Sequence, residues 1–224
     1  MNIDIWLAGF FYLLILVLQI SMAAFGYILE PTPKHYESDA KLLIFNSDPR
    51  KFKIGVVLAL IEHFCIITLA LLLFIAFNLY NIILGIILII FRIIEGSIQV
   101  YIEKDYWKLL NIAKKYSTAS DTDKNSLFDS YSSILQTKSN RFAFAMLCWA
   151  IGTLAFSIIL VIFGVVPLFI GWLGIVASIA IGALNGIKLL KIEFKSYNVL
   201  SSVSGLVSIV FEILIGGWLL YLSI

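Results

Sequence analysis

The sequence predicts an all-α fold, an integral membrane bundle of six transmembrane helices with a cytoplasmic helical hairpin between spans three and four. Hydrophobic residues make up 61% of the 224 residues and charged residues 13%, with a mean hydropathy of +1.01. Soluble domains are about half apolar and about a quarter charged, so this composition excludes a soluble globular protein. Six apolar stretches each have the roughly 20 residues that cross a hydrocarbon core of about 30 Å. All but one of the 16 lysines and arginines lie in connections on one side of these stretches.

We predict one membrane domain over residues 1–224. The six predicted spans cover residues 5–28, 54–77, 82–102, 142–163, 168–187 and 203–222. The chain begins MNIDIW, without the basic region of a signal peptide, and the apolar run that follows is too long for one. We therefore expect the first span to be retained.

The basic residues predict the topology. The connection after the first span holds five of them, the connection after the third holds seven and the connection after the fifth holds three. The N-terminus, residues 78–81, residues 164–167 and the C-terminus hold none. Because basic connections stay in the cytoplasm, we expect a protein of the cell (inner) membrane with both termini outside. Basic loops beside an anionic leaflet need no nucleic acid to account for them, so the predicted contact is the lipid bilayer.

The connections themselves carry local signals. Pro31 and Pro33 are expected to end the first helix, and residues 39–45 to form one or two turns in the membrane interface. Asp48 followed by Pro49 predicts an N-cap with proline at the first helical position. The two connections on the opposite side have only four residues each, so spans two and three, and spans four and five, should form adjacent antiparallel pairs.

The segment 103–141 is the one sizeable connection. The third helix is expected to continue through EKDYWKLLNIAKKY, with a turn at 117–125 and then a second helix. That second helix carries an apolar stripe, which consists of Leu127, Phe128, Tyr131, Ile134 and Leu135. Such a stripe covers the end of the bundle or rests on lipid, or it forms a docking site for a protein partner at 103–141. The first interpretation is favoured because interfacial amphipathic helices are common beside spans.

Small and aromatic residues indicate how the helices pack. Gly182 and Gly186 form a G-x-x-x-G in the fifth span, which is interpreted as tight packing within one bundle in preference to dimerisation, with the oligomeric state left open. Tryptophans 6, 172 and 218 lie near the outer boundary and are interpreted as an aromatic belt.

Several polar side chains enter the predicted spans and form a candidate functional site. The predicted buried polar centre consists of Glu62, His63, Arg92, Glu95, Glu212, Gln19 and Gln99. At 1.5 Å per residue, its charged members lie about 10 to 15 Å from the basic ends of their helices. A charge at that depth costs at least about 2.5 to 3.5 kcal/mol, so these groups should face inward and pair.

Three glutamates face one arginine in this centre, and two interpretations stay open. In the first, at least one glutamate is protonated and the centre couples to a proton or a cation. In the second, Arg92 clamps two glutamates from neighbouring helices as a structural lock, and the third stays neutral. We predict that Arg92 pairs with Glu62 or Glu212 across helices, besides lying beside Glu95.

Enzymatic interpretations are not favoured. His35 and His63 are the only histidines, so a three-histidine zinc site cannot form, and neither lies in an H-E-x-x-H motif. Cys65 and Cys148 fall within spans and are expected to be reduced, packed thiols. The serine-rich segment 201–205 lacks the context of a rhomboid-like protease, and Glu62 lacks the paired glutamates of CAAX-processing proteases. We expect no catalytic residue, no metal and no cofactor.

Several stretches resemble the six-helix prokaryotic membrane family known as domain of unknown function 4386. These stretches are AKLLIFNSDPRKFKIGVVLALIEH, FRIIEGSIQVY, GVVPLFIGWLGIVASI and FEILIGGWLLY. The more specific features are the pair Arg92 and Glu95 and, around Glu212, the glycine, tryptophan and leucine at 217–219. The chain departs from the family after Pro167, where Phe169 and Ile170 stand in place of a basic residue. The resemblance implies a six-helix bundle and no established activity.

Two functions of different classes fit these observations. The leading one is a small transporter or permeation protein that uses the buried carboxylates. The alternative is a non-catalytic membrane scaffold or assembly partner that acts through its cytoplasmic hairpin. Transport predicts a cavity that reaches Glu62, Glu95 or Glu212, whereas a scaffold predicts a dry, fully paired centre.

Overall fold

The fold is all-helical, as the sequence predicts. The computed structural model describes residues 2–25, 27, 48–192 and 196–224, and within them it contains helices and no strand. The helices are α1 (Ile3–Ala24), α4 (Pro49–Phe77), α5 (Ile82–Tyr116), α6 (Asp121–Ile162), α7 (Leu168–Leu189) and α8 (Tyr197–Leu222). Each is long and apolar enough to cross a membrane. Pro31, Pro33 and the interfacial turns expected at 39–45 lie outside the described residues, as does the predicted end of the first span at residue 28.

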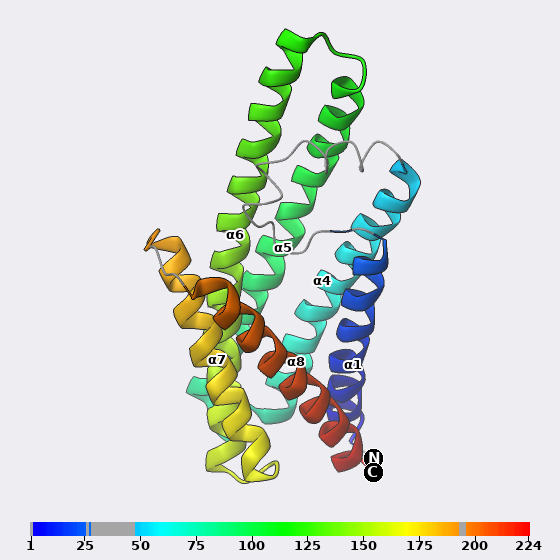
Figure 1. Ribbon diagram of the computed structural model, residues 1–224. Helices are drawn as coiled ribbons and strands as arrows, with labels where there is room; N and C mark the ends of the chain where they lie inside the picture. Colours follow the sequence, from blue (N-terminus) through cyan, green and yellow to red (C-terminus); the bar gives the residue numbers. More distant parts are fainter. Residues whose placement is uncertain (1, 26, 28–47, 193–195) are drawn as a thin grey trace.

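The six helices form a closed ring. Each helix packs against its neighbours along the chain, and α8 packs back against α1 (Figure 1). The pairs α4 with α5 and α6 with α7 are antiparallel neighbours, which confirms the expectation from their short connections. A ring of this kind leaves a central space that all six helices can line.

The ring closes where α1 crosses α8. A Cβ added to Gly9 would lie 2.8 Å from the backbone oxygen of Gly216, so only glycine allows the two helices to approach this closely. Beside this crossing the backbone N–H of Asn2 donates to the carbonyl oxygen of Ser223 at 3.1 Å. Both termini therefore lie side by side at one end of the bundle (Figure 1).

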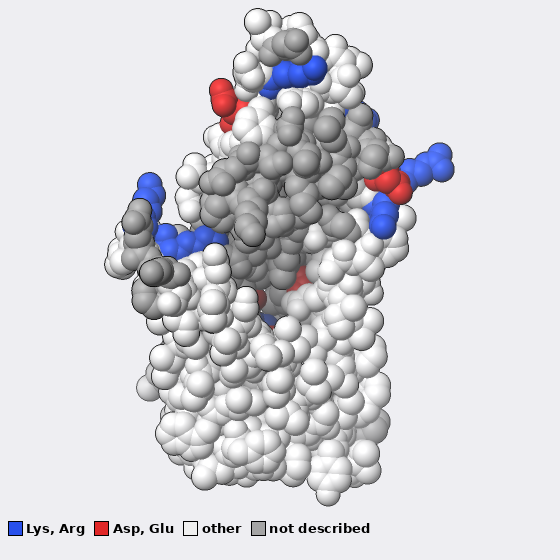
Figure 2. Space-filling model, viewed as in Figure 1, with Lys and Arg blue, Asp and Glu red and all other residues white. Residues whose placement is uncertain are grey.

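The opposite end carries the basic residues and is called the basic end. It is formed by the start of α4, the end of α7 and the hairpin of α5 and α6, which projects beyond the other helices (Figure 1). In the space-filling view, lysine and arginine side chains gather over this end, while the rest of the bundle surface on the face shown is uncharged (Figure 2). Such an uncharged band is the surface that a bilayer requires.

At the basic end, α4 and α6 each begin directly after a residue whose side chain caps the helix N-terminus. The backbone N–H of Lys51 donates to the Asp48 carboxylate at 3.0 Å with Pro49 at the first helical position, which confirms the predicted N-cap of α4. The expected turn at 117–125 was too long, because α6 begins already at Asp121. Ser120 is its N-cap and accepts from the backbone N–H of Asp123 at 3.4 Å, in an S-x-x-D pattern typical of a helix start.

The apolar stripe of the hairpin packs against the rest of the molecule, with Leu127, Phe128 and Ile134 partly buried. Tyr131 and Leu135 are fully buried and belong to a cluster with Tyr106, Leu109 and other residues of the basic end. The stripe therefore packs on the molecule itself, as the favoured interpretation expects. A protein partner at 103–141 stays a prediction.

Glycines of α7 make close contacts within the bundle. A Cβ at Gly174 would lie 2.3 Å from Oγ of Ser157 and 2.6 Å from the Phe211 ring, and one at Gly182 would lie 3.2 Å from the Cβ of Ala150. A Cβ at Gly186 would meet nothing within 4 Å. Only the first glycine of the G-x-x-x-G motif thus serves as a contact, and it packs on α6.

Candidate functional site

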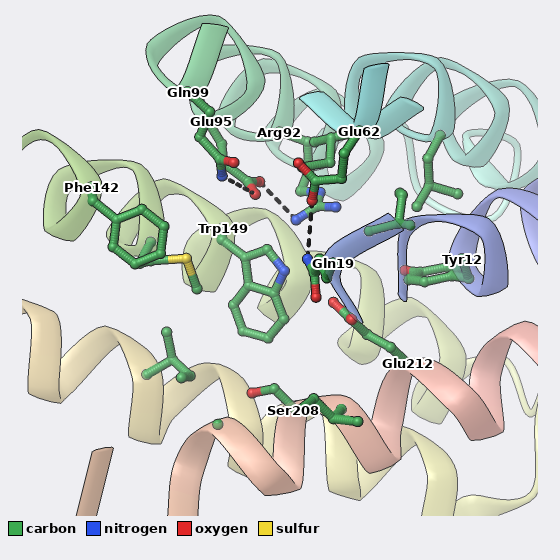
Figure 3. Close-up of a pocket in the computed structure, with 17 residues that line it drawn as sticks. Tyr12, Gln19, Glu62, Arg92, Glu95, Gln99, Phe142, Trp149, Ser208 and Glu212 are labelled. Carbon is green, nitrogen blue, oxygen red and sulfur yellow. Dashed lines mark hydrogen bonds and ion pairs between the residues drawn. The ribbon is translucent and has the colours of Figure 1, made fainter. Parts of the chain in front are cut away.

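A cavity of about 190 Å³ lies inside the ring, and residues from all six helices line it (Figure 3). Six members of the predicted polar centre line it, namely Gln19, Glu62, Arg92, Glu95, Gln99 and Glu212. We call it the central cavity. The structure thus gathers these six side chains at one place and leaves out the seventh, His63. Whether the cavity is a functional site stays a prediction.

Helix α5 supplies the most buried part of the lining. Arg92, Glu95 and Gln99 are spaced three and four residues apart, which places them on one helix face. A guanidinium nitrogen, Nη1 of Arg92, donates to Oε2 of Glu95 at 2.7 Å, and Nε2 of Gln99 donates to Oε1 of the same carboxylate at 3.2 Å. Both oxygens of Glu95 therefore have a partner on their own helix.

The predicted pairing of Arg92 across helices was wrong. Within the described residues its ion pair is with Glu95 alone, and neither Glu62 nor Glu212 comes within ion-pair distance of it. Gly152 of α6 helps to explain this, because a Cβ there would lie 2.8 Å from Cγ of Arg92. The arginine side chain thus lies against the bare backbone of α6 and folds along α5 toward Glu95.

Glu62 of α4 is 1% exposed and has a neutral partner. Nε2 of Gln19 donates to its Oε1 at 3.0 Å (Figure 3). Its Oε2 lies 2.5 Å from Nδ1 of the neighbouring His63, in an arrangement that lacks the angles of a hydrogen bond. An amide donor compensates a carboxylate charge only partly, so Glu62 is less well neutralised than Glu95.

Glu212 enters the cavity from α8 and is partly exposed (Figure 3). The Trp149 indole of α6 lines the same cavity (Figure 3). No cation pairs with it among the described residues. The central cavity thus holds three carboxylates and one guanidinium, which is committed to Glu95.

His63 belongs to a second buried group of polar side chains, nearer the basic end. Its Nε2 lies 3.2 Å from Oε1 of Glu103, and the Tyr27 hydroxyl donates to the same oxygen. Close by, the ammonium of Lys138, which is 1% exposed, donates to the Tyr106 hydroxyl. We call these five residues the His63–Glu103 cluster.

The sequence interpretation missed this cluster apart from His63. One signal was available, since Glu103 follows Gln99 by four residues and so continues the polar face of α5. Tyr27 and Lys138 come from a helix end and from the hairpin, and no spacing in the sequence places them beside Glu103. Their positions follow from how α6 and Tyr27 pack against α5.

Metal binding finds no support in the part of the chain that the structure describes. No group of three or more histidine, cysteine, aspartate or glutamate side chains there is placed to hold a metal ion. Cys65 and Cys148 are buried free thiols on separate helices, α4 and α6. The charged and amide side chains that line the central cavity are three carboxylates, two amides and one guanidinium.

The central cavity has room for water. A water molecule needs about 10 to 15 Å³ of such volume, so about 190 Å³ accommodates several waters or a small ligand. Figure 2 shows a hollow in the uncharged surface toward the basic end, with acidic and basic atoms at its floor. This arrangement can bind a proton or a small cation, because carboxylates outnumber cations and some of their oxygens remain accessible.

Three comparisons with known proteins give one family match. No curated protein and no solved structure is significantly similar to the chain. A family profile, described as "Domain of unknown function (DUF4386)", matches residues 7–222 and so covers nearly the whole chain. With six helices suited to crossing a membrane, this integral, multi-pass membrane protein belongs to the DUF4386 family.

Proposed function

We propose that this protein is a small transporter or permeation protein that binds a small cation, a proton included, in the central cavity. The observation that carries the proposal is a cavity lined by all six helices in which three carboxylates share one arginine. A site that every helix lines is one that movements of the helices relative to each other can open to either side. Such movement is how transporters give alternating access to a site near the middle of the membrane.

The charge of the cavity indicates the class of ligand. Arg92 pairs with Glu95, which leaves Glu62 beside the Gln19 amide and the His63 imidazole, and Glu212 without a charged partner among the described residues. An ionised carboxylate away from water is costly unless it is paired or protonated. A mobile cation or proton supplies the missing partner, whereas an anion would add to the unpaired charge.

We further propose that the basic end faces the cytoplasm and both termini face the outside. The support is the confinement of fifteen basic residues to the connections at that end. A reporter that is active only in the cytoplasm should be silent after Ile224 and active near Thr122. The reverse pattern would overturn the orientation without touching the cavity.

The test of transport uses the purified protein in liposomes with an imposed potassium diffusion potential. The probes are protons, followed with an entrapped pH-sensitive dye, and radiolabelled sodium, rubidium and methylammonium. At least one probe should enter faster than in protein-free liposomes, and Glu212→Gln should abolish that uptake, because an amide neither titrates nor pairs with a cation. Asp129→Asn, which removes an exposed carboxylate of the hairpin, is the matched control and should leave uptake unchanged.

The same Glu212→Gln variant separates transport from a structural role. Since Glu212 pairs with no cation among the described residues, its neutral mimic should melt within a few degrees of the wild type. A large loss of stability at neutral pH would make Glu212 a structural charge. Uptake of no probe would favour the alternative of a membrane scaffold, whose partner would have to use faces of the hairpin other than its buried apolar stripe.

A further inference from the structure

The His63–Glu103 cluster directly adjoins the central cavity. Glu62 lines the cavity, and its Oε2 lies 2.5 Å from Nδ1 of His63. On the other side of the imidazole ring, Nε2 lies 3.2 Å from Oε1 of Glu103. Each of the three side chains is at most 2% exposed. A continuous file of titratable groups therefore leads from the cavity toward the basic end.

The polar atoms along this file are incompletely satisfied. Oε2 of Glu62, Nδ1 of His63 and Oε2 of Glu103 are buried and have no hydrogen-bond partner in the described structure. Most buried polar atoms in proteins have one, so three exceptions in one file require an explanation. A small cavity of about 10 Å³, lined by Tyr27, Glu103, Lys138 and others, adjoins the far end and has about the volume of one water.

We propose that His63 relays protons between Glu62 at the central cavity and Glu103 at the basic end, so that the coupling ion of this protein is the proton. This inference rests on the proposed function and names the ion and its route. Histidine suits the role because its two ring nitrogens can accept a proton on one side and release one on the other. Here Glu62 of α4 is the proton donor on one side of the ring, and Glu103 of α5 is the acceptor on the other.

The transfer conserves protons and charge. It begins with Glu62 protonated on Oε2, a neutral His63 with its proton on Nε2, and an ionised Glu103. The Oε2–H bond of Glu62 breaks as Nδ1 gains the proton, and the Nε2–H bond breaks as Oε1 of Glu103 gains the other. Glu103 then releases its proton to water at the basic end, and Glu62 takes a new proton from the central cavity. The cycle closes when the His63 side chain reorients about its Cα–Cβ and Cβ–Cγ bonds, so that its N–H again points toward Glu103 and its bare nitrogen toward Glu62.

The surroundings of Glu103 support its place as the outer acceptor. Among the described residues, the charged or titratable groups that face His63 and Glu103 are Glu62 from α4, Tyr27 after α1, Tyr106 from α5 and Lys138 from α6. The Tyr27 hydroxyl donates to Oε1 of Glu103, the same oxygen that lies 3.2 Å from Nε2 of His63. Glu103 also directly follows the predicted span 82–102, so water at the membrane boundary is near.

The test measures potential-driven proton uptake in the same liposomes with wild type, His63→Gln and Glu103→Gln. Glutamine can donate and accept hydrogen bonds and cannot relay a proton, so each variant should lower proton uptake by about a hundredfold, the scale of a lost acid–base group. His35→Gln, which changes the other histidine of the chain, is the control and should not alter uptake. A second readout is chemical rescue, in which added imidazole should restore uptake to His63→Ala, an effect that repair of packing alone would not give.

The outcomes distinguish the relay from the proposed function. Unchanged proton uptake in His63→Gln, with uptake lost in Glu212→Gln, would overturn the relay and leave cation transport standing. If the wild-type protein transports sodium or methylammonium and no protons, the relay is likewise overturned and cation transport stands. If no probe is taken up, both the relay and the proposed transport function are overturned. If His63→Gln does not fold, Glu103→Gln still decides the matter, because unchanged proton uptake in that variant would overturn the relay.

Discussion

The same two helices, α5 and α6, pass through two regions in which charge is handled in opposite ways. In the hairpin, Asp105 is 3% exposed and has two cations, with Nη1 of Arg141 at 2.5 Å and Nζ of Lys108 at 3.1 Å. In the central cavity, three carboxylates share one cation. The hairpin has more positive charge than its buried aspartate needs, and the cavity has less than its glutamates need.

The difference follows from what each region borders. Lysines at the basic end reach water, as Lys108 does with 57% of its side chain exposed, so a countercharge there costs little. Within a bilayer each added lysine or arginine costs several kcal/mol, so a carboxylate can be neutralised cheaply only by a proton or a small ion. The central cavity therefore lacks positive charge, and the proposed cation or proton would supply it.

The largest expected difference in stability comes from breaking one ion pair in each region. Arg92→Leu leaves Glu95 buried without its cation and should lower the free energy of unfolding by about 3 to 5 kcal/mol. Arg141→Leu removes a side chain that is 33% exposed and leaves Asp105 with Lys108, so about 1 kcal/mol or less is expected. Denaturation of both variants in the same detergent measures the contrast. Equal losses would mean that Glu95 is as easily neutralised as Asp105.

A smaller effect concerns the space that Arg92 occupies. Gly152→Ala would place a Cβ 2.8 Å from Cγ of Arg92 and 3.2 Å from the backbone oxygen of Leu88, and should destabilise the protein by about 1 to 2 kcal/mol. Gly205→Ala, at another position on the same cavity, meets nothing within 4 Å and should stabilise α8 by about 0.5 to 1 kcal/mol. Thermal melts of the two variants should shift in opposite directions. A shift in the same direction would show that Arg92 moves aside freely.

The smallest effect concerns the packed core of the hairpin. Burial raises the pKa of Tyr131 from 10.0 to about 12. A raised pKa in the folded state means that this residue's contribution to stability is complete below pH 10 and is lost as the pH rises through about 12. Tyr131→Phe should therefore show a shallower fall in melting temperature between these pH values. Parallel curves for the two proteins would mean that the phenol reaches water.

Much of the fold could be predicted from the sequence because it depends on local patterns. Apolar length defines the six helices, Asp48 and Pro49 define the start of α4, and short connections define the antiparallel pairs. The spacing of Arg92, Glu95 and Gln99 likewise placed them on one face of α5. These features need only the periodicity of a helix and the thickness of a bilayer.

The partners of the polar residues could not be predicted in the same way. Depth along a helix can be counted, but the rotation of one helix relative to another is set by packing contacts such as that of Gly152 with Arg92. The sequence therefore indicated that Glu62 and Arg92 lie at similar depth and gave no means of knowing that they do not pair. For the same reason the sequence did not reveal that Lys138, one of the seven basic residues after the third span, is only 1% exposed.

The closure of the ring by α8 against α1 also bears on how the chain is made. Helices enter the membrane in the order of synthesis, so α1 and α4 to α7 form an open arc until α8 arrives. During that interval the face that carries Glu62, Arg92 and Glu95 borders lipid, where charged groups are costly. We expect chains that stall before α8 to be the form that membrane quality-control proteases remove. The acidic lining would then report during biogenesis whether the protein is complete.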